Sequence, residues 1–137
     1  MALAALTVTA CINLNDTNEP TRIWEATLVP EIAYPDLTGQ VAVISSALGT
    51  QMGIGIAGAE FGSVHAWSLW LGTCAEPGVR FGGPSDYPDL EVTISGTVET
   101  EALFGARLDA TRNYSAEVTV SAADSSRVAC GDLVLTQ

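Results

Sequence analysis

Residues 63–72 have the sequence SVHAWSLWLG, in which large hydrophobic side chains alternate with others along most of the stretch. Period-two alternation is typical of a β-strand, because successive side chains of a strand point to opposite sides. The sequence therefore predicts a strand here with one face in the core and the other looking outward. The expected core face carries Trp67, Leu69 and Leu71, and the expected outward face carries Ala66, Ser68 and Trp70.

The same pattern recurs along the chain, as short apolar runs rich in β-forming residues and separated by turn residues, with no sustained helical periodicity. Eight such runs predict an all-β fold, a Greek-key antiparallel barrel or sandwich. In 114–121 the expected outward residues are Ser115, Glu117 and Thr119, opposite Ala116, Val118 and Val120. The strands are expected near 22–30, 40–46, 51–58, 63–72, 90–95, 98–108, 114–121 and 127–136, with the longest irregular stretch at 72–89.

Composition limits the function classes. The chain has 137 residues, enough for one domain, and 47% of them are hydrophobic, but no apolar run approaches the length that spans a bilayer. Sixteen Asp and Glu stand against five Arg and no Lys, for a net charge of −11. Such a chain repels phosphate backbones and anionic lipid, so nucleic-acid binding is not expected.

The three cysteines predict one disulfide and one residue with another role. Cys11 follows the apolar segment 2–10, and Val8-Thr9-Ala10-Cys11 resembles the lipobox of a bacterial lipoprotein signal, which implies lipidation of Cys11. The alternative is that residues 2–9 form an ordinary strand and Cys11 is a buried thiol. The Asn-rich residues 12–21 are typical of a tether, so a single folded domain is expected over 22–137.

Two cysteine segments resemble a known family. Residues 126–133, SRVACGDL, look like the last strand of the Cu/Zn superoxide dismutases, and residues 72–78, GTCAEPG, are similar to that family's disulfide-bearing loop. Bacterial envelope proteins of the superoxide dismutase-like and CHRD-like group are closer still, since Trp67 and the segment Tyr87-Pro88-Asp89-Leu90 also match their pattern. The resemblance implies a Cys74–Cys130 disulfide and an exported protein of the cell envelope or extracellular space.

The metal ligands of that family are missing. Its His-x-His positions correspond to Ser68 and Trp70, and its later histidine to Thr119. Only His65 remains in the sequence, and we expect it to be an ordinary strand-end or rim histidine. A catalytic copper or zinc site needs several imidazoles, so no metal, no cofactor and no catalytic residues are expected. Arg127 matches the arginine that guides superoxide, but it is expected to pair with an acidic neighbour.

The favoured hypothesis is a non-catalytic, metal-free module for protein binding or structure. Its contact face would be the former metal face, with either a protein partner or another copy of the chain as the occupant. The alternative is a self-assembling subunit that adds segment 2–9 as a strand to a neighbouring sheet, and the least favoured is a residual dismutase or other metalloenzyme. A membrane would be reached only through a lipid anchor at Cys11. The expected contact residues are Ser68, Trp70, Glu117 and Thr119.

Overall fold

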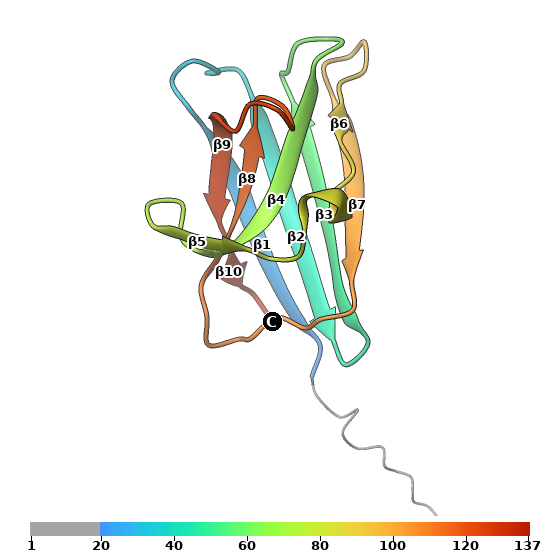
Figure 1. The fold of residues 1–137 in the computed structure, drawn as a ribbon, viewed down its shortest axis with the longest axis vertical. Coiled ribbons are helices and arrows are strands. Elements are labelled where there is room, and N and C mark those ends of the chain that lie inside the picture. Colours follow the sequence, from blue (N-terminus) through green and yellow to red (C-terminus); the bar gives the residue numbers. More distant parts are fainter. Residues whose placement is uncertain (1–19) are drawn as a thin grey trace, which may run out of the picture.

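The computed structural model describes residues 20–137, which form one curled antiparallel sheet (Figure 1). The described residues contain no helix with the length and apolar character needed to cross a membrane. A short 3-10 helix lies at Pro84–Asp86. The strands are β1 Arg22–Pro30, β2 Thr38–Ser46, β3 Gly49–Ala57, β4 Val64–Gly72, β5 Pro77–Arg80, β6 Leu90–Glu91, β7 Val98–Phe104, β8 Tyr114–Thr119, β9 Arg127–Asp132 and β10 Val134–Leu135.

The strand order is β5-β4-β8-β9-β1-β2-β3-β7, with β10 added to β1 and β6 to β4. Only β1–β2, β2–β3, β4–β5 and β8–β9 join neighbours in sequence, while β3–β7, β4–β8 and β1–β9 are crossovers of the Greek-key kind. The sheet curls so that β4, β8 and β9 lie across from β1, β2 and β3 (Figure 1). The prediction of an all-β Greek-key barrel or sandwich is therefore confirmed.

The core fills the space between these two halves. Its side chains come from the inward positions of every long strand, as the alternation requires. The rings of Trp24 and Tyr114 pack edge to face with 6.1 Å between their centroids, and the rings of Trp67 and Tyr87 do so with 5.1 Å between theirs. Gly131 of β9 allows a close backbone approach to β1, because a Cβ there would lie 2.6 Å from the Thr27 carbonyl oxygen. These contacts fix how β4, β8 and β9 sit over the rest of the sheet.

The prediction that one face of β4 and β8 points to solvent is wrong for three residues. Ser68, Ser115 and Thr119 are only 6%, 1% and 9% exposed. The physical reason is that residues of β5, which pairs with the edge of β4, and of the loops after β5 and β8 surround this face, which alternation within single strands does not reveal. Conversely, Leu71 and Val120, expected in the core, are only half-buried against it.

Other strand boundaries also differ. The stretch 72–89 is not wholly irregular, because it contains β5. The strand expected at 90–95 is only β6, since Thr93, Ser95 and Thr97 exchange hydroxyl hydrogen bonds in a turn. The strand expected at 98–108 ends at Phe104, and the one expected at 127–136 is interrupted at Leu133.

Candidate binding site

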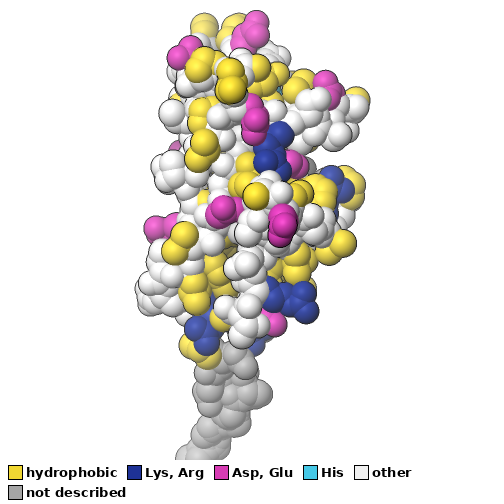
Figure 2. All heavy atoms as spheres, turned by 90° about the vertical axis from the view of Figure 1, so that its left-hand side faces the viewer, with side chains coloured by type: hydrophobic (Ala, Val, Ile, Leu, Met, Phe, Trp, Pro, Cys, Tyr) yellow, Lys and Arg dark blue, Asp and Glu magenta, His cyan; other side chains and the backbone are white. Residues whose placement is uncertain are grey.

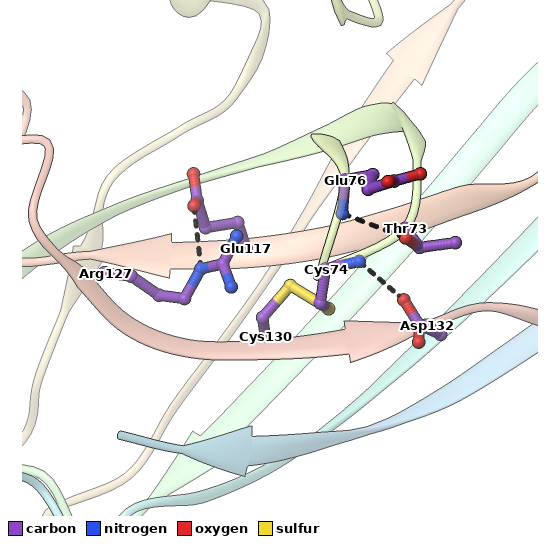
Figure 3. Close-up of a disulfide and its surroundings, with 7 residues drawn as sticks. All are labelled: Thr73, Cys74, Glu76, Glu117, Arg127, Cys130 and Asp132. Carbon is purple, nitrogen blue, oxygen red and sulfur yellow. Dashed lines mark hydrogen bonds and ion pairs between the residues drawn. A yellow bond between two sulfur atoms is a disulfide. The ribbon is translucent and has the colours of Figure 1, made fainter. Parts of the chain in front are cut away.

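The disulfide holds the segment that leads into β5. Cys74 is bonded to Cys130 of β9 with a Cα–Cα distance of 6.0 Å, which confirms this pairing. The Cys74 amide donates to Asp132 Oδ1 at 2.7 Å, and the Glu76 amide donates to Thr73 Oγ1 at 3.0 Å (Figure 3). Disulfides persist in oxidising surroundings, so this bond indicates an extracellular or envelope environment.

Gly72 allows the sharp turn before Cys74. Its φ is +102°, a conformation that L side chains rarely adopt, and a Cβ there would lie 2.5 Å from the Glu76 carbonyl oxygen. The chain then returns as β5, which pairs with β4 so that Arg80 lies opposite Trp70. A glycine and a disulfide thus place β5 beside β4, at the edge of the sheet.

A cavity of about 340 Å³ lies between β4, β5 and β8. All four residues of the contact face predicted from sequence line it, namely Ser68 and Trp70 of β4 and Glu117 and Thr119 of β8. Figure 2 views the β5 side of the molecule, where hydrophobic side chains gather at mid-height beside arginine and carboxylate side chains. The other lining residues are Ala66, Trp67, Pro77, Gly78, Arg80, Pro84, Tyr87, Asp89, Ser121, Ala122 and Ser125.

Trp70 forms part of the cavity wall and is half-buried. The guanidinium carbon of Arg80 lies 4.9 Å from its ring centroid, a cation–π contact. Trp70 Nε1 and Arg80 Nε are both buried without a hydrogen-bond partner among residues 20–137. Trp70 therefore does not protrude from the surface. It forms one wall of a partly enclosed cavity.

Glu117 and Arg127 form an ion pair across β8 and β9. Arg127 Nε donates to Glu117 Oε2 at 3.0 Å, and the two side chains are 26% and 15% exposed (Figure 3). The carboxylate charge in the cavity wall is thereby compensated by an arginine. This is the acidic pairing that the sequence predicts for Arg127.

His65 is buried at the start of β4 and is 6% exposed. Its Nδ1 lies 3.1 Å from the carbonyl oxygens of Thr119 and Val120, and its Nε2 lies 3.2 Å from Ser63 Oγ. Both ring nitrogens thus have polar partners within the protein. Within 20–137 there is no group of three or more His, Cys, Asp or Glu side chains placed to hold a metal ion.

Tyr87 closes the cavity from the loop after β5. It is 6% exposed, packs against Trp67 and Phe104, and its hydroxyl donates to the Phe81 carbonyl oxygen. Burial raises the pKa of Tyr87 to about 12, against the lowering effects of its backbone hydrogen bond to Leu69 and of the Arg80 charge. The phenol is therefore held neutral as part of the packing.

The pKa of Tyr87 gives a pH-dependent prediction. Because the folded pKa lies above the ordinary value of about 10, its contribution is complete below about pH 10 and is lost as the pH rises to about 12. The loss in the free energy of unfolding should be of order 2 kcal/mol by the end of this window. Denaturant unfolding against pH should show it, and Tyr87→Phe should remove this part of the decline while Tyr34→Phe should not. A Tyr87 phenol that titrates near its ordinary pKa would contradict the expectation.

The contact face predicted from the sequence did not include the other lining residues, Arg80 and Tyr87 among them. The one available signal for Arg80 was its alternation with Gly78 in a short run after Pro77, but four residues are too few for a confident strand. Tyr87 appears in the sequence analysis only within the segment 87–90 that matches the resembling group, with no role predicted for it. Cys11, segment 2–9 and all but the last two residues of the expected tether lie outside the described residues, so these predictions stay predictions.

A larger hollow of about 590 Å³ lies on the outer face of β1, β2, β3 and β7. Its floor is formed at Ala42, Gly53 and Gly55, which carry little or no side chain, and Glu99 and Glu101 flank it. It is wide and open, and no buried donor or acceptor without a partner lines it. We therefore take the smaller cavity as the candidate site.

A scan against models of protein families finds no match to this chain, and a search of curated proteins finds no similar sequence.

Proposed function

We propose that this protein is a non-catalytic binding module of the cell envelope or extracellular space, and that it binds a partner protein at the cavity between β4, β5 and β8. The observation that carries the proposal is that Ser68, Trp70, Glu117 and Thr119, from two strands far apart in sequence, line one cavity. The Cys74–Cys130 disulfide supports the proposed location, because disulfides persist in oxidising surroundings such as the cell envelope or extracellular space.

The composition of the cavity favours a protein partner. Trp, Tyr and Arg are enriched among residues that dominate binding at protein interfaces, and Trp70, Tyr87 and Arg80 all line this recess. A volume of about 340 Å³ accommodates one large side chain or a chain terminus of a partner.

Two observations support a non-catalytic role. The positions that correspond to histidines in the resembling family, Ser68, Trp70 and Thr119, do come together, but none of them is a ligand for copper or zinc. His65, the only imidazole in the sequence, has both nitrogens in hydrogen bonds on the other side of β4. A metal site at this cavity would have to be built without an imidazole.

We expect negligible copper or zinc binding and no superoxide dismutation above buffer. Elemental analysis after incubation with each metal and dialysis measures the first, and a superoxide consumption assay measures the second. Stoichiometric metal that survives dialysis, together with activity, would favour the residual dismutase instead.

The self-assembly alternative has a weaker basis in the described residues. Among residues 20–137, β7 has only β3 as a hydrogen-bonded neighbour, so no described strand pairs with its other edge, but Glu99 and Glu101 are exposed on it. Charged side chains on an edge strand oppose the addition of a further strand. Sedimentation over a range of concentrations should find no self-association, and the intact mass should show whether Cys11 carries diacylglycerol.

The binding proposal is tested by mapping small probes on the surface. Two-dimensional NMR of the labelled protein with a library of small aromatic and polar compounds should show perturbations that cluster at Ser68, Trp70, Arg80 and Thr119, because interface hot spots attract such compounds. Ala122→Trp should block the cavity mouth and abolish the cluster. Its matched control, Ala123→Trp, adds the same side chain at a neighbouring exposed position that does not line the cavity, and should leave the cluster intact. Probes that gather elsewhere, or that ignore Ala122→Trp, would overturn the proposal.

A further inference from the structure

We propose that the group which this cavity binds is a carboxylate, received by the Arg80 guanidinium and the Trp70 indole N–H. The inference rests on the proposed function and names the chemistry of its ligand. It starts from two buried donors that belong to one cross-strand pair, since Arg80 and Trp70 lie opposite each other on β5 and β4.

Among residues 20–137, Arg80 has no anionic side chain in an ion pair with it. It stacks on Trp70 and lies near Tyr87, and its Nε is buried with no acceptor in the described part of the chain. By contrast, Arg127 is paired with Glu117 and Arg112 with Asp109. In a chain with sixteen carboxylates, an unpaired and partly buried guanidinium is costly unless something else supplies the acceptor.

The indole N–H of Trp70 also lacks a hydrogen-bond acceptor among residues 20–137. An indole N–H can only donate, and a buried one without an acceptor costs free energy. Trp67, on the same strand, shows the usual solution, because its Nε1 donates to the Pro88 carbonyl oxygen at 2.6 Å. No such oxygen reaches Trp70 Nε1 in the described part of the chain.

A ligand that satisfies both donors accepts hydrogen bonds, and the guanidinium favours a negative charge on it. A carboxylate meets both needs, since its two oxygens match the planar fork of a guanidinium. Ser68, buried in the same wall, supplies a hydroxyl that can donate as well. Stacking on Trp70 holds the guanidinium in place before the ligand arrives, which lowers the entropy cost of binding.

The carboxylate in the cavity wall does not oppose this assignment, because Glu117 is compensated by Arg127. Asp86 does not line the cavity, and Asp89 lines it but is exposed to solvent. The net charge of −11 does select among partners, because it repels a strongly acidic segment. We therefore expect the ligand to be a single carboxylate group, either the C-terminus or one acidic side chain, in a partner segment that carries no other charge.

The test compares benzoate with benzamide, which has the same ring but a neutral amide in place of the carboxylate. The indole signal of Trp70 is assigned with Trp70→Phe and followed by NMR as each compound is added to the labelled protein. Benzoate should shift this signal in the direction of a stronger hydrogen bond, and benzamide should bind about ten-fold more weakly or worse. Arg80→Gln should weaken benzoate binding by about ten-fold, whereas Arg112→Gln, in an exposed ion pair, should not.

Each other result overturns the inference in a recognisable way. Equal binding of benzamide would leave a cavity that binds neutral rings, so the proposed function would stand and the carboxylate would not. Stronger shifts with inorganic phosphate than with benzoate would assign the site to tetrahedral oxyanions. No response to benzoate, benzamide or the compound library would remove both proposals. If Arg80→Gln fails to fold, Arg80→Lys keeps the charge without the planar fork, and unchanged benzoate binding in that variant would contradict the role of the guanidinium.

Discussion

Replacing both Cys74 and Cys130 with alanine is expected to lower the free energy of unfolding by about 4 kcal/mol. The two residues lie 56 positions apart, and the chain-entropy model assigns about this value to the closure of such a loop. For a domain of this size the loss corresponds to a fall of roughly 10 °C or more in the melting temperature. Denaturant and thermal unfolding of the variant and the parent measure it.

Reduction of the unaltered protein provides the control. A reducing agent should destabilise the parent by a similar amount and leave the double alanine variant unchanged, because that variant has no bond to break. The cavity should also loosen, since Cys74 fixes the segment that leads into β5. A loss below about 1 kcal/mol would mean that the bond does not constrain the chain as described.

Trp67→Ala is expected to cost about 3–5 kcal/mol of folding stability, in the range found for truncation of large buried aromatic side chains. Trp67 is 3% exposed, packs edge to face on Tyr87, and donates its indole N–H to the Pro88 carbonyl oxygen. The variant leaves a cavity and also removes the donor to the Pro88 carbonyl oxygen. Equilibrium unfolding in denaturant is the measurement.

An exposed aromatic gives the matched comparison. Phe61 is 65% exposed, so Phe61→Ala should change the free energy of unfolding by no more than about 0.5 kcal/mol. Trp67→Phe should lie between the two, because it keeps most of the ring and loses the N–H. Similar values for Trp67→Ala and Phe61→Ala would show that β4 does not face the core through Trp67.

Most of the fold could be predicted from local patterns. The strand at 22–30 has the same bounds as β1, because its alternation is regular and turn residues limit it. β10 could not be foreseen, since Val134 and Leu135 pair with β1 only after Leu133 turns the chain. The buried Ser68 and Ser115 were missed for a related reason. Each is polar and lies on the face opposite the core, and only tertiary cover by other segments removes it from water.

The candidate site could be predicted only in part. Ser68, Trp70 and Thr119 were predicted because they correspond to the histidine positions of the resembling family, and Glu117 because it shares the expected outward face with Thr119. The antiparallel pairing of β4 with β8 does place the four residues together. Arg80 was out of reach, because its importance comes from standing opposite Trp70 across β5 and β4, a register that depends on the turn at Gly72 and on the disulfide. That Arg80 Nε has no acceptor among residues 20–137 is visible only once its neighbours are in place.

The most direct test of the central claim is a crystal structure of the protein soaked with a mixture of small organic probes. The account predicts that probes cluster in the cavity bounded by Ser68, Trp70, Arg80 and Thr119, with an acceptor oxygen near Trp70 Nε1. Probes that cluster instead over Gly53 and Gly55 on the outer face of the sheet, or a cavity that holds only water, would contradict it.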